Sequence, residues 1–247
     1  MTSIITVIVS FLRAVIRIMT PLLLGGVGEL VVEKSGILNL GLEGLMLFGA
    51  FSGFVVTYYA GNPWIGLLAA IIVSMVVNIV FALLTVSLAL DQVVTGLAVT
   101  LMASGATFYL YRAIFGWYVS PVPPHVETII EETPIPLLSK IPIIGPILFD
   151  QTIFTYIAFI LTILTYYIFK KTSWGLKITA CGEDPLVSDY LGIDVVKIRY
   201  LTLLFEGALA GMAGALLSIS QYNMFLDNMT SGRVYIIICL LYTSDAA

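Results

Sequence analysis

Polar side chains interrupt otherwise apolar stretches of this sequence, and their types decide what chemistry they could do there. They are four carboxylates and three amides: Glu29, Glu43, Asp91 and Glu206, with Asn39, Asn78 and Gln92. If those stretches cross a membrane, a charged side chain at a helix centre costs roughly 2.5–3.5 kcal/mol, so such groups usually face protein or water. The pattern therefore predicts a polar pathway between helices. The alternative is that these groups only hydrogen-bond one helix to another.

Asn39, Glu43, Asn78 and Gln92 are the residues we expect to line or support such a pathway. Asn39 and Glu43 are four residues apart, so in a continuous helix they would share one face. Glycines surround them, at Gly36, Gly41 and Gly44. That density predicts a broken or closely packed helix, a backbone tolerated at membrane depth only where it lines a cavity or is buried in protein. For Asn78 alone, an interhelical hydrogen bond is the simpler interpretation.

Asp91 precedes Gln92 at the start of an apolar stretch. It has a second interpretation as an N-terminal cap of the helix that follows.

Signals of catalysis and metal binding are missing from the sequence. The only histidine, His125, has no neighbouring histidine, cysteine or carboxylate cluster, and Cys181 and Cys239 lie in unrelated contexts. Hydrolase, metalloprotease and redox motifs are absent, as is the glycine-rich phosphate loop of many ATPases. We therefore predict no catalytic residue, no metal site and no cofactor in this chain.

A charged connection at Lys170–Arg199 carries the clearest helix signals. Asp184 suits an N-cap, and Pro185 suits the first helical position. Gly192 suits the position just after a helix end. These residues predict a short helix, Pro185–Leu191, standing between two apolar stretches. It is either a plain connector or a segment that a partner protein grips.

Composition places the whole chain in a lipid bilayer. Of 247 residues, 60% are hydrophobic and 11% are charged, and the mean hydropathy is +1.05. Soluble domains carry about 25% charged residues, so this chain has too little polar surface for water. Basic patches with interleaved aromatics are missing, which argues against nucleic-acid binding.

Six stretches are long and apolar enough to cross a membrane as helices. The class predicted is all-α: a polytopic transmembrane bundle forming one domain over residues 1–247. The expected spans are Ile4–Val32, Ile37–Tyr58, Trp64–Leu90, Val93–Phe115, Ile153–Phe169 and Leu201–Ile219. Small residues four apart, as in Gly49/Gly53 and Gly207/Gly211, predict close packing of the helices. The final run Val234–Tyr242 is too short to span.

The two long connections predict sidedness. Residues 116–150 are proline-rich and mainly acidic, whereas residues 170–199 carry five basic side chains (Lys170, Lys171, Lys177, Lys197 and Arg199). Cytoplasmic loops are enriched in Lys and Arg. We therefore expect 116–150 to be an extracytoplasmic loop and 170–199 a cytoplasmic one, which puts the N-terminus outside.

Several motifs resemble one family of transporters. Glu33–Gly44, Asp91–Gly96 and Gly182–Pro185 followed by Leu191–Ile193 resemble signatures of bacterial ATP-binding-cassette (ABC) importer permeases of the branched-chain amino acid and ribose type. Gly207–Gly211, Tyr222–Phe225 and Met229–Arg233 extend the similarity. Within this family the motifs are most similar to the branch paired with basic-membrane-protein lipoproteins, which imports nucleosides.

The resemblance implies a type-II-like permease subunit in the bacterial plasma membrane. It implies several partners: an ABC ATPase that binds ATP, a second permease subunit, an extracytoplasmic substrate-binding lipoprotein and membrane lipid. It also implies that the cytoplasmic connection 170–199 couples to the ATPase. The residues expected to do so are Gly182, Glu183, Asp184, Pro185, Leu186, Leu191 and Gly192.

Nucleosides are the expected solute, with simple sugars or another small solute as the alternative. A membrane-embedded enzyme or a non-transporting scaffold would be a different class, but the first predicts catalytic pairs that the sequence lacks, and the second leaves Asn39 and Glu43 unexplained. Family members continue beyond the Met229–Arg233 motif, so we expect about Ile238–Ala247 not to be a native ending.

Overall fold

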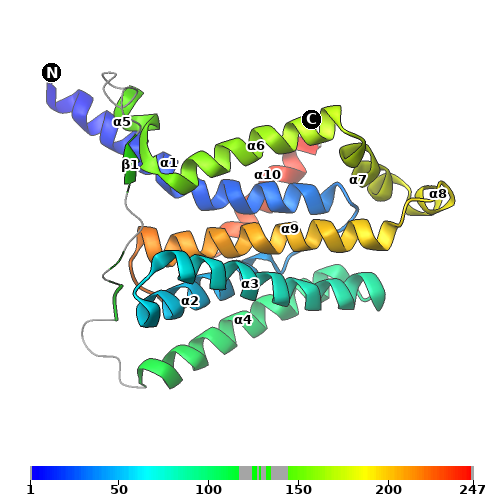
Figure 1. The fold of residues 1–247 in the computed structure, drawn as a ribbon, viewed down its shortest axis with the longest axis horizontal. Helices are drawn as coiled ribbons and strands as arrows, with labels where there is room; N and C mark the ends of the chain where they lie inside the picture. The colour runs from blue at the N-terminus through cyan, green and yellow to red at the C-terminus, as the bar shows by residue number, and fades with distance from the viewer. Residues whose placement is uncertain (1, 117–123, 127, 129–131, 135–143, 246–247) are drawn as a thin grey trace.

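A computed structural model describes residues 2–116, 124–126, 128, 132–134 and 144–245, and the described part is almost entirely helical (Figure 1). The long helices are α1 (Thr2–Glu33), α2 (Leu42–Ala60), α3 (Pro63–Ala82), α4 (Gln92–Phe115), α6 (Ile153–Lys171) and α9 (Val195–Ala215). Shorter elements are α5 (Ile144–Leu148), α7 (Ser173–Glu183), α8 (Pro185–Tyr190), α10 (Arg233–Asp245), and the paired strands β1 (Glu132–Pro134) and β2 (Asp150–Thr152). One π-helical turn, η1 (Leu83–Ser87), continues α3, and another, η2 (Leu216–Gln221), continues α9.

The six predicted spans are confirmed as long apolar helices. By length and composition the candidates are Ile4–Glu33, Leu42–Ala60, Pro63–Ser87, Gln92–Phe115, Ile153–Lys171 and Val195–Gln221. The main difference is at the second span, which begins at Leu42 rather than at Ile37. Residues 34–41 form turns and extended backbone. The expectation of a broken helix at the glycines is therefore correct, but the break covers the whole start of the predicted span.

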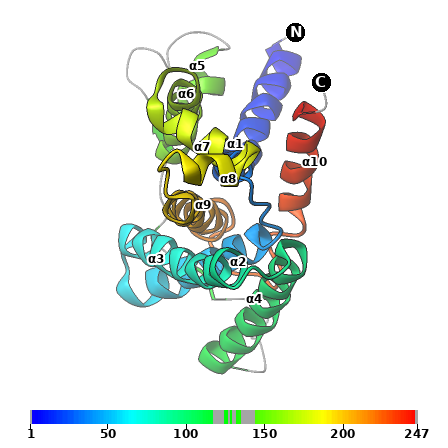
Figure 2. The ribbon, with the colours of Figure 1, turned by 90° about the vertical axis from the view of Figure 1, so that its right-hand side faces the viewer.

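Helix α9 lies at the centre of the bundle and packs against α1, α2 and α3 (Figures 1 and 2). Small residues allow these backbones to approach, as their spacing predicted. A methyl group added to Gly49 on α2 would come within 2.7 Å of the Cα of Gly211 on α9, and one added to Gly211 within 2.5 Å of the carbonyl oxygen of Ala70 on α3. Side chains are excluded at these contacts, so three helices pack backbone to backbone.

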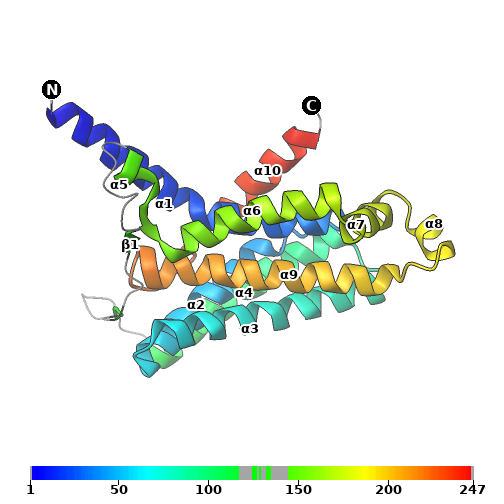
Figure 3. The same ribbon diagram turned by 45° about the horizontal axis from the view of Figure 1, so that its top comes forward.

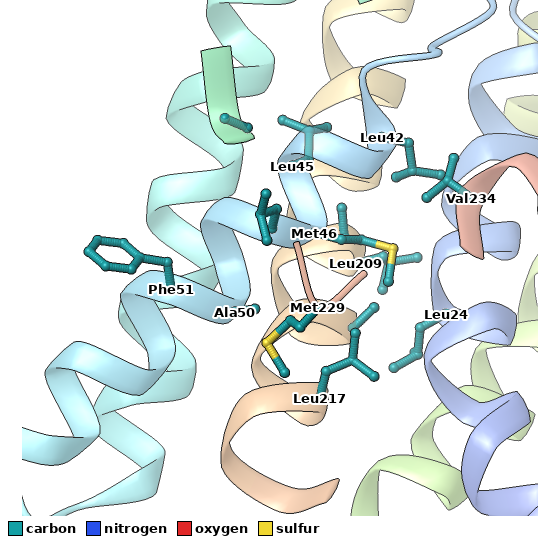
Figure 4. Packing of buried hydrophobic residues seen from close by; sticks show 14 of the residues in the cluster. Leu24, Leu42, Leu45, Met46, Ala50, Phe51, Leu209, Leu217, Met229 and Val234 are labelled. Carbon is teal, nitrogen blue, oxygen red and sulfur yellow. The ribbon is translucent and has the colours of Figure 1, made fainter. Parts of the chain in front are cut away.

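Apolar side chains from α1, α2, α9 and α10 fill the adjoining core. Leu24, Leu42, Met46, Leu217 and Val234 are among its fully or almost fully buried members (Figure 4). Large apolar side chains elsewhere, such as those on the outer faces of α3, α4 and α6, remain exposed to what would be lipid. The bundle thus has a packed interior and an apolar exterior, as a membrane protein requires.

The described parts of the two long connections stand at opposite ends of the bundle (Figures 1 and 3). Helices α7 and α8 are at one end, and β1, α5 and the start of α6 are at the other. Part of the predicted loop 116–150, namely residues 117–123, 127, 129–131 and 135–143, lies outside the described residues. The predicted connection 170–199 is mostly helical. Thr172 caps α7, and the basic residues Lys197 and Arg199 belong to the first turns of α9.

Candidate functional site

Asn39 is the centre of a buried polar cluster. Its backbone N–H donates to Oε1 of Glu29 on α1 at 3.1 Å, and its side-chain amide donates to Oδ1 of Asn78 on α3 at 3.1 Å and to Oε2 of Glu206 on α9 at 2.9 Å. The Asn78 amide also donates to Oε2 of Glu206, at 3.0 Å. All four side chains are fully buried. The cluster therefore ties α1, α3 and α9 to the break before α2.

The break is what brings Asn39 to this place. Gly36, with φ +84°, takes a left-handed conformation that few other residues adopt, and it turns the chain after α1. The side-chain oxygen of Asn39 then accepts from the backbone N–H of Gly41 at 2.9 Å. An asparagine that bonds the backbone two residues on favours a turn over a helix. The expectation that Asn39 and Glu43 share a helix face is therefore wrong, because Asn39 precedes the helix.

Glu43 has a different environment, on the first turn of α2. Its carboxylate accepts from the backbone N–H of Gly232 at 2.8 Å and from that of Val234 at 3.1 Å. These amides belong to the start of α10, where Val234 lies beside Leu42 (Figure 4). A carboxylate at a helix N-terminus satisfies amides that lack an intrahelical partner and complements the helix dipole. Glu43 thus fixes the place where α10 begins.

Gln92 and Asp91 hold backbone at the start of α4. The side-chain oxygen of Gln92 accepts from the N–H of Leu38, within the break, at 2.8 Å. Asp91 accepts from the N–H of Val94 at 2.9 Å, which confirms its interpretation as a helix cap. Gln92 therefore anchors the break to α4.

Of the predicted pathway residues, Asn39 and Asn78 come together, whereas Glu43 and Gln92 each stand at a separate backbone contact. Glu29 and Glu206 were visible in the sequence as charges within spans, but their partnership with Asn39 was not predicted. Asn39 is 10 residues from Glu29 and 167 residues from Glu206 in the sequence, and a single sequence carries no signal for such pairings.

The predicted helix after Asp184 is present as α8, Pro185–Tyr190. Oδ1 of Asp184 accepts from the N–H of Leu186 and of Val187, both at 3.0 Å, and Gly192 follows the helix with φ +81°. Both expected caps are therefore in place. Glu183, Asp184 and Pro185 are exposed beside them.

Helix α8 presents apolar side chains outward. Leu186 is 72% exposed and Leu191 is 74% exposed, with Val187 and Tyr190 beside them. Exposed apolar side chains on a short capped helix at the end of a bundle are typical of a contact surface for another protein. Behind this surface, Gly182 at the end of α7 lies so close to the turn after α1 that an added methyl group would come within 2.5 Å of the carbonyl oxygen of Lys34. The surface of α8 is therefore connected through α7 to the break that holds Asn39.

With this geometry in view, comparison with known proteins decides the family. Residues 11–241 match the family described as "Branched-chain amino acid transport system / permease component". The chain belongs to this family. It is a permease of an ABC transporter and a multi-pass protein of the plasma membrane.

Relatives of the permease include three named transporter subunits. It is 36% identical over 93% of its length to "Putative glucose ABC transporter permease protein TsgC13" of Haloferax volcanii, covering 69% of that protein. It is 33% identical over 90% of its length to "Guanosine ABC transporter permease protein NupQ" of Bacillus subtilis, covering 70% of it. It is 32% identical over 88% of its length to "Nucleoside ABC transporter permease protein NupC" of Lactococcus lactis, covering 69% of it. No solved structure matches the permease significantly.

Proposed function

We propose that the permease imports a nucleoside, driven by a separate ATPase subunit. The names of NupQ and NupC support this solute, and the motifs in the sequence resemble the nucleoside branch of the family. The similarity to TsgC13 supports a simple sugar as the second candidate. The further partners of this proposal are a second permease subunit and an extracytoplasmic lipoprotein that delivers the solute, and ATP binds to the ATPase.

The geometry of α8 is the observation that supports a separate ATPase subunit. The helix is held by Asp184 and Gly192, presents Leu186 and Leu191, and stands at the opposite end of the bundle from β1 and α5, the described elements of the connection 116–150. The basic residues beside α8 favour the cytoplasmic side for this end. A helix capped at both ends has already lost much of its conformational entropy, so docking on a partner costs less. We assign α8 as the segment that the ATPase grips.

The route from α8 to the membrane interior passes through Gly182. Because Gly182 packs directly on the turn at Lys34 and Gly36, a displacement of α7 moves the break after α1. That break carries Asn39, and Gln92 ties it to α4. We infer that Asn39 and Asn78, together with Gln92 and Glu43, support the translocation pathway by setting the position of backbone rather than by exposing side chains to it.

Uptake of labelled solutes tests the substrate. Cells expressing the permease with its ATPase, second permease subunit and lipoprotein should accumulate labelled guanosine or another nucleoside, and an excess of unlabelled nucleoside should compete. Equal excesses of glucose and ribose should not compete. Accumulation of glucose without nucleoside uptake would establish the sugar instead.

Solute-stimulated ATP hydrolysis tests the role of α8. In the reconstituted complex, Leu186→Asp combined with Leu191→Asp should reduce stimulated hydrolysis by tenfold or more, because charge is then buried at the contact; about 1.4 kcal/mol corresponds to each factor of ten. The matched control, Leu186→Met with Leu191→Met, keeps the surface apolar and should retain most activity. If the double Asp variant still binds the ATPase and keeps full stimulation, α8 is only a connector.

A further inference from the structure

Two buried carboxyl oxygens of the polar cluster have no hydrogen-bond donor. They are Oε2 of Glu29 and Oε1 of Glu206. The other oxygen of each group is bonded: Oε1 of Glu29 accepts from the Asn39 backbone, and Oε2 of Glu206 accepts from the amides of Asn39 and Asn78. Both side chains have zero exposed surface. A buried carboxyl oxygen without a donor is costly, so the two oxygens require an explanation.

The two carboxyl groups lie close enough that a proton on one can be donated to the other. Their backbones are also close, since a methyl group added to Gly28, next to Glu29, would lie 3.2 Å from the Cα of Glu206. Two ionised carboxylates in contact, away from water, repel each other strongly, and such pairs keep a proton between them.

We propose that Glu29 and Glu206 form a proton-binding site that holds one proton. The geometry places the proton on Oε2 of Glu29, where it is donated to Oε1 of Glu206, so that one hydrogen bond satisfies both unpaired oxygens. The remaining negative charge belongs to Glu206, because its Oε2 already accepts from two amide groups. Glu29 accepts only one backbone N–H on its other oxygen, which favours it as the neutral partner.

The neighbouring charges do not replace the proton. The charged groups on the elements packed around the pair are Arg13, Arg17 and Glu33 on α1, Lys34 in the break, Glu43 on α2, Lys170 and Lys171 on α6, Lys197 and Arg199 on α9, and Arg233 and Asp245 on α10, while the sequence of α3 has none. Glu33 adds repulsion on the side of Glu29. Arg199 donates to the carbonyl of Ser35, and Glu43 is bonded to the start of α10. The hydrogen bonds to the pair come from amides, which carry no charge.

The site makes the packing of α1 on α9 depend on pH. The native pair keeps a proton that the unfolded chain releases near the usual glutamate pKa, about 4.3. Because the native state then binds more protons than the unfolded state, stability falls as pH rises above that value, until the native pair itself ionises. In this window one bound proton changes the unfolding equilibrium constant by about tenfold per pH unit.

Glu29→Gln is the variant that tests the site. Its amide donates to Oε1 of Glu206 and its oxygen accepts from Asn39, so it reproduces the protonated state permanently. We expect the purified permease in detergent to show, between about pH 5 and pH 8, a slope of log unfolding constant against pH that is smaller in Glu29→Gln than in the wild type by about one proton. Glu206→Gln should remove the same slope. It should destabilise the protein more than Glu29→Gln does, because the negative charge then moves to Glu29. Equal slopes in all three proteins would overturn the proposal.

Infrared spectroscopy of the wild type does not depend on the folding of any variant. At neutral pH we expect a carbonyl band of a protonated carboxyl group that Glu29→Gln removes. Glu43→Gln is the matched control. Glu43 is also buried in the membrane region, but its carboxylate accepts hydrogen bonds from two backbone N–H groups and is not part of the pair, so this variant should keep the band. Absence of the band from the wild type would refute the site. A thermal stability that rises with sodium over choline in the wild type, and not in Glu29→Gln, would show a bound cation instead of a proton.

Discussion

The carboxylate of Glu43 accepts from the backbone N–H of Val234 at 3.1 Å, across 191 residues of sequence. This hydrogen bond joins the first turn of α2 to the first turn of α10 in the interior of the bundle. A helix that begins there must have its free amides satisfied by protein, because lipid cannot do so. The start of α10 is therefore held in part by one side chain of another helix.

Replacing Glu43 should loosen α10. Glu43→Ala leaves one buried amide and one partly buried amide without an acceptor, and we expect a loss of about 2 kcal/mol in stability. Glu43→Gln retains one acceptor and should lose less. Thermal unfolding in detergent measures both, with transport assayed in parallel. If transport is lost while the unfolding temperature of Glu43→Ala is unchanged, Glu43 contacts the solute directly and its structural role is minor.

Gly182 should tolerate no side chain. Gly182→Ala places a methyl group within 2.5 Å of the carbonyl oxygen of Lys34, so α7 must move away from the turn after α1. We expect transport to fall several-fold while ATPase binding through α8 persists. Gly105→Ala on α4 is the matched control, because nothing lies within 4 Å of its added methyl group. It should be neutral, or stabilising by up to about 1 kcal/mol through helix propensity. Equal effects of the two substitutions would refute the packing argument.

Substitutions at Gly192 should differ in their effect according to how readily each residue adopts a left-handed backbone. Its φ of +81° has open space around it, so strain rather than collision decides the outcome. Gly192→Val should weaken the end of α8 by about 1–2 kcal/mol, whereas Gly192→Asn should cost less, since asparagine visits this conformation. Stimulated ATP hydrolysis should follow the same order. A valine variant as active as the asparagine variant would show that the end of α8 does not matter for coupling.

Thiol labelling should place the two ends of the bundle on opposite sides of the membrane. In a background with Cys239→Ser, an impermeant reagent on intact cells should label Tyr59→Cys and not Tyr190→Cys, which should react only after permeabilisation. Both positions are well exposed. The native Cys181 need not be removed: burial raises the pKa of its thiol, and the thiolate is the reactive species. Labelling of Tyr190→Cys in intact cells would reverse the proposed orientation.

Local features of the fold were predictable from sequence, because their causes are local. Asp184, Pro185 and Gly192 each favour a particular place at a helix end, and α8 forms between them. Apolar runs identified the spans, and small residues four apart identified where α2 and α9 approach. Helix α7 was missed, since its Thr172 cap stands within a basic connection whose charges suggested a loop.

The contacts of the polar cluster were not predictable, because they depend on tertiary structure. Asn39 and Glu43 satisfy the spacing of one helix face, yet the glycine turn at Gly36 and the bond from Asn39 to Gly41 place Asn39 outside the helix. Whether Glu29 would meet Glu206 or some other polar group depends on how α1 crosses α9, which hydrophobic periodicity does not determine.

The backbone contacts among α2, α3 and α9 restrict how these three helices can move relative to one another. Gly49, Gly211 and Gly214 leave no layer of side chains between these helices, so one cannot slide or rotate past another without a clash of main-chain atoms. Packed interfaces of this kind move as units. We therefore expect α2, α3 and α9 to move as one unit during the transport cycle.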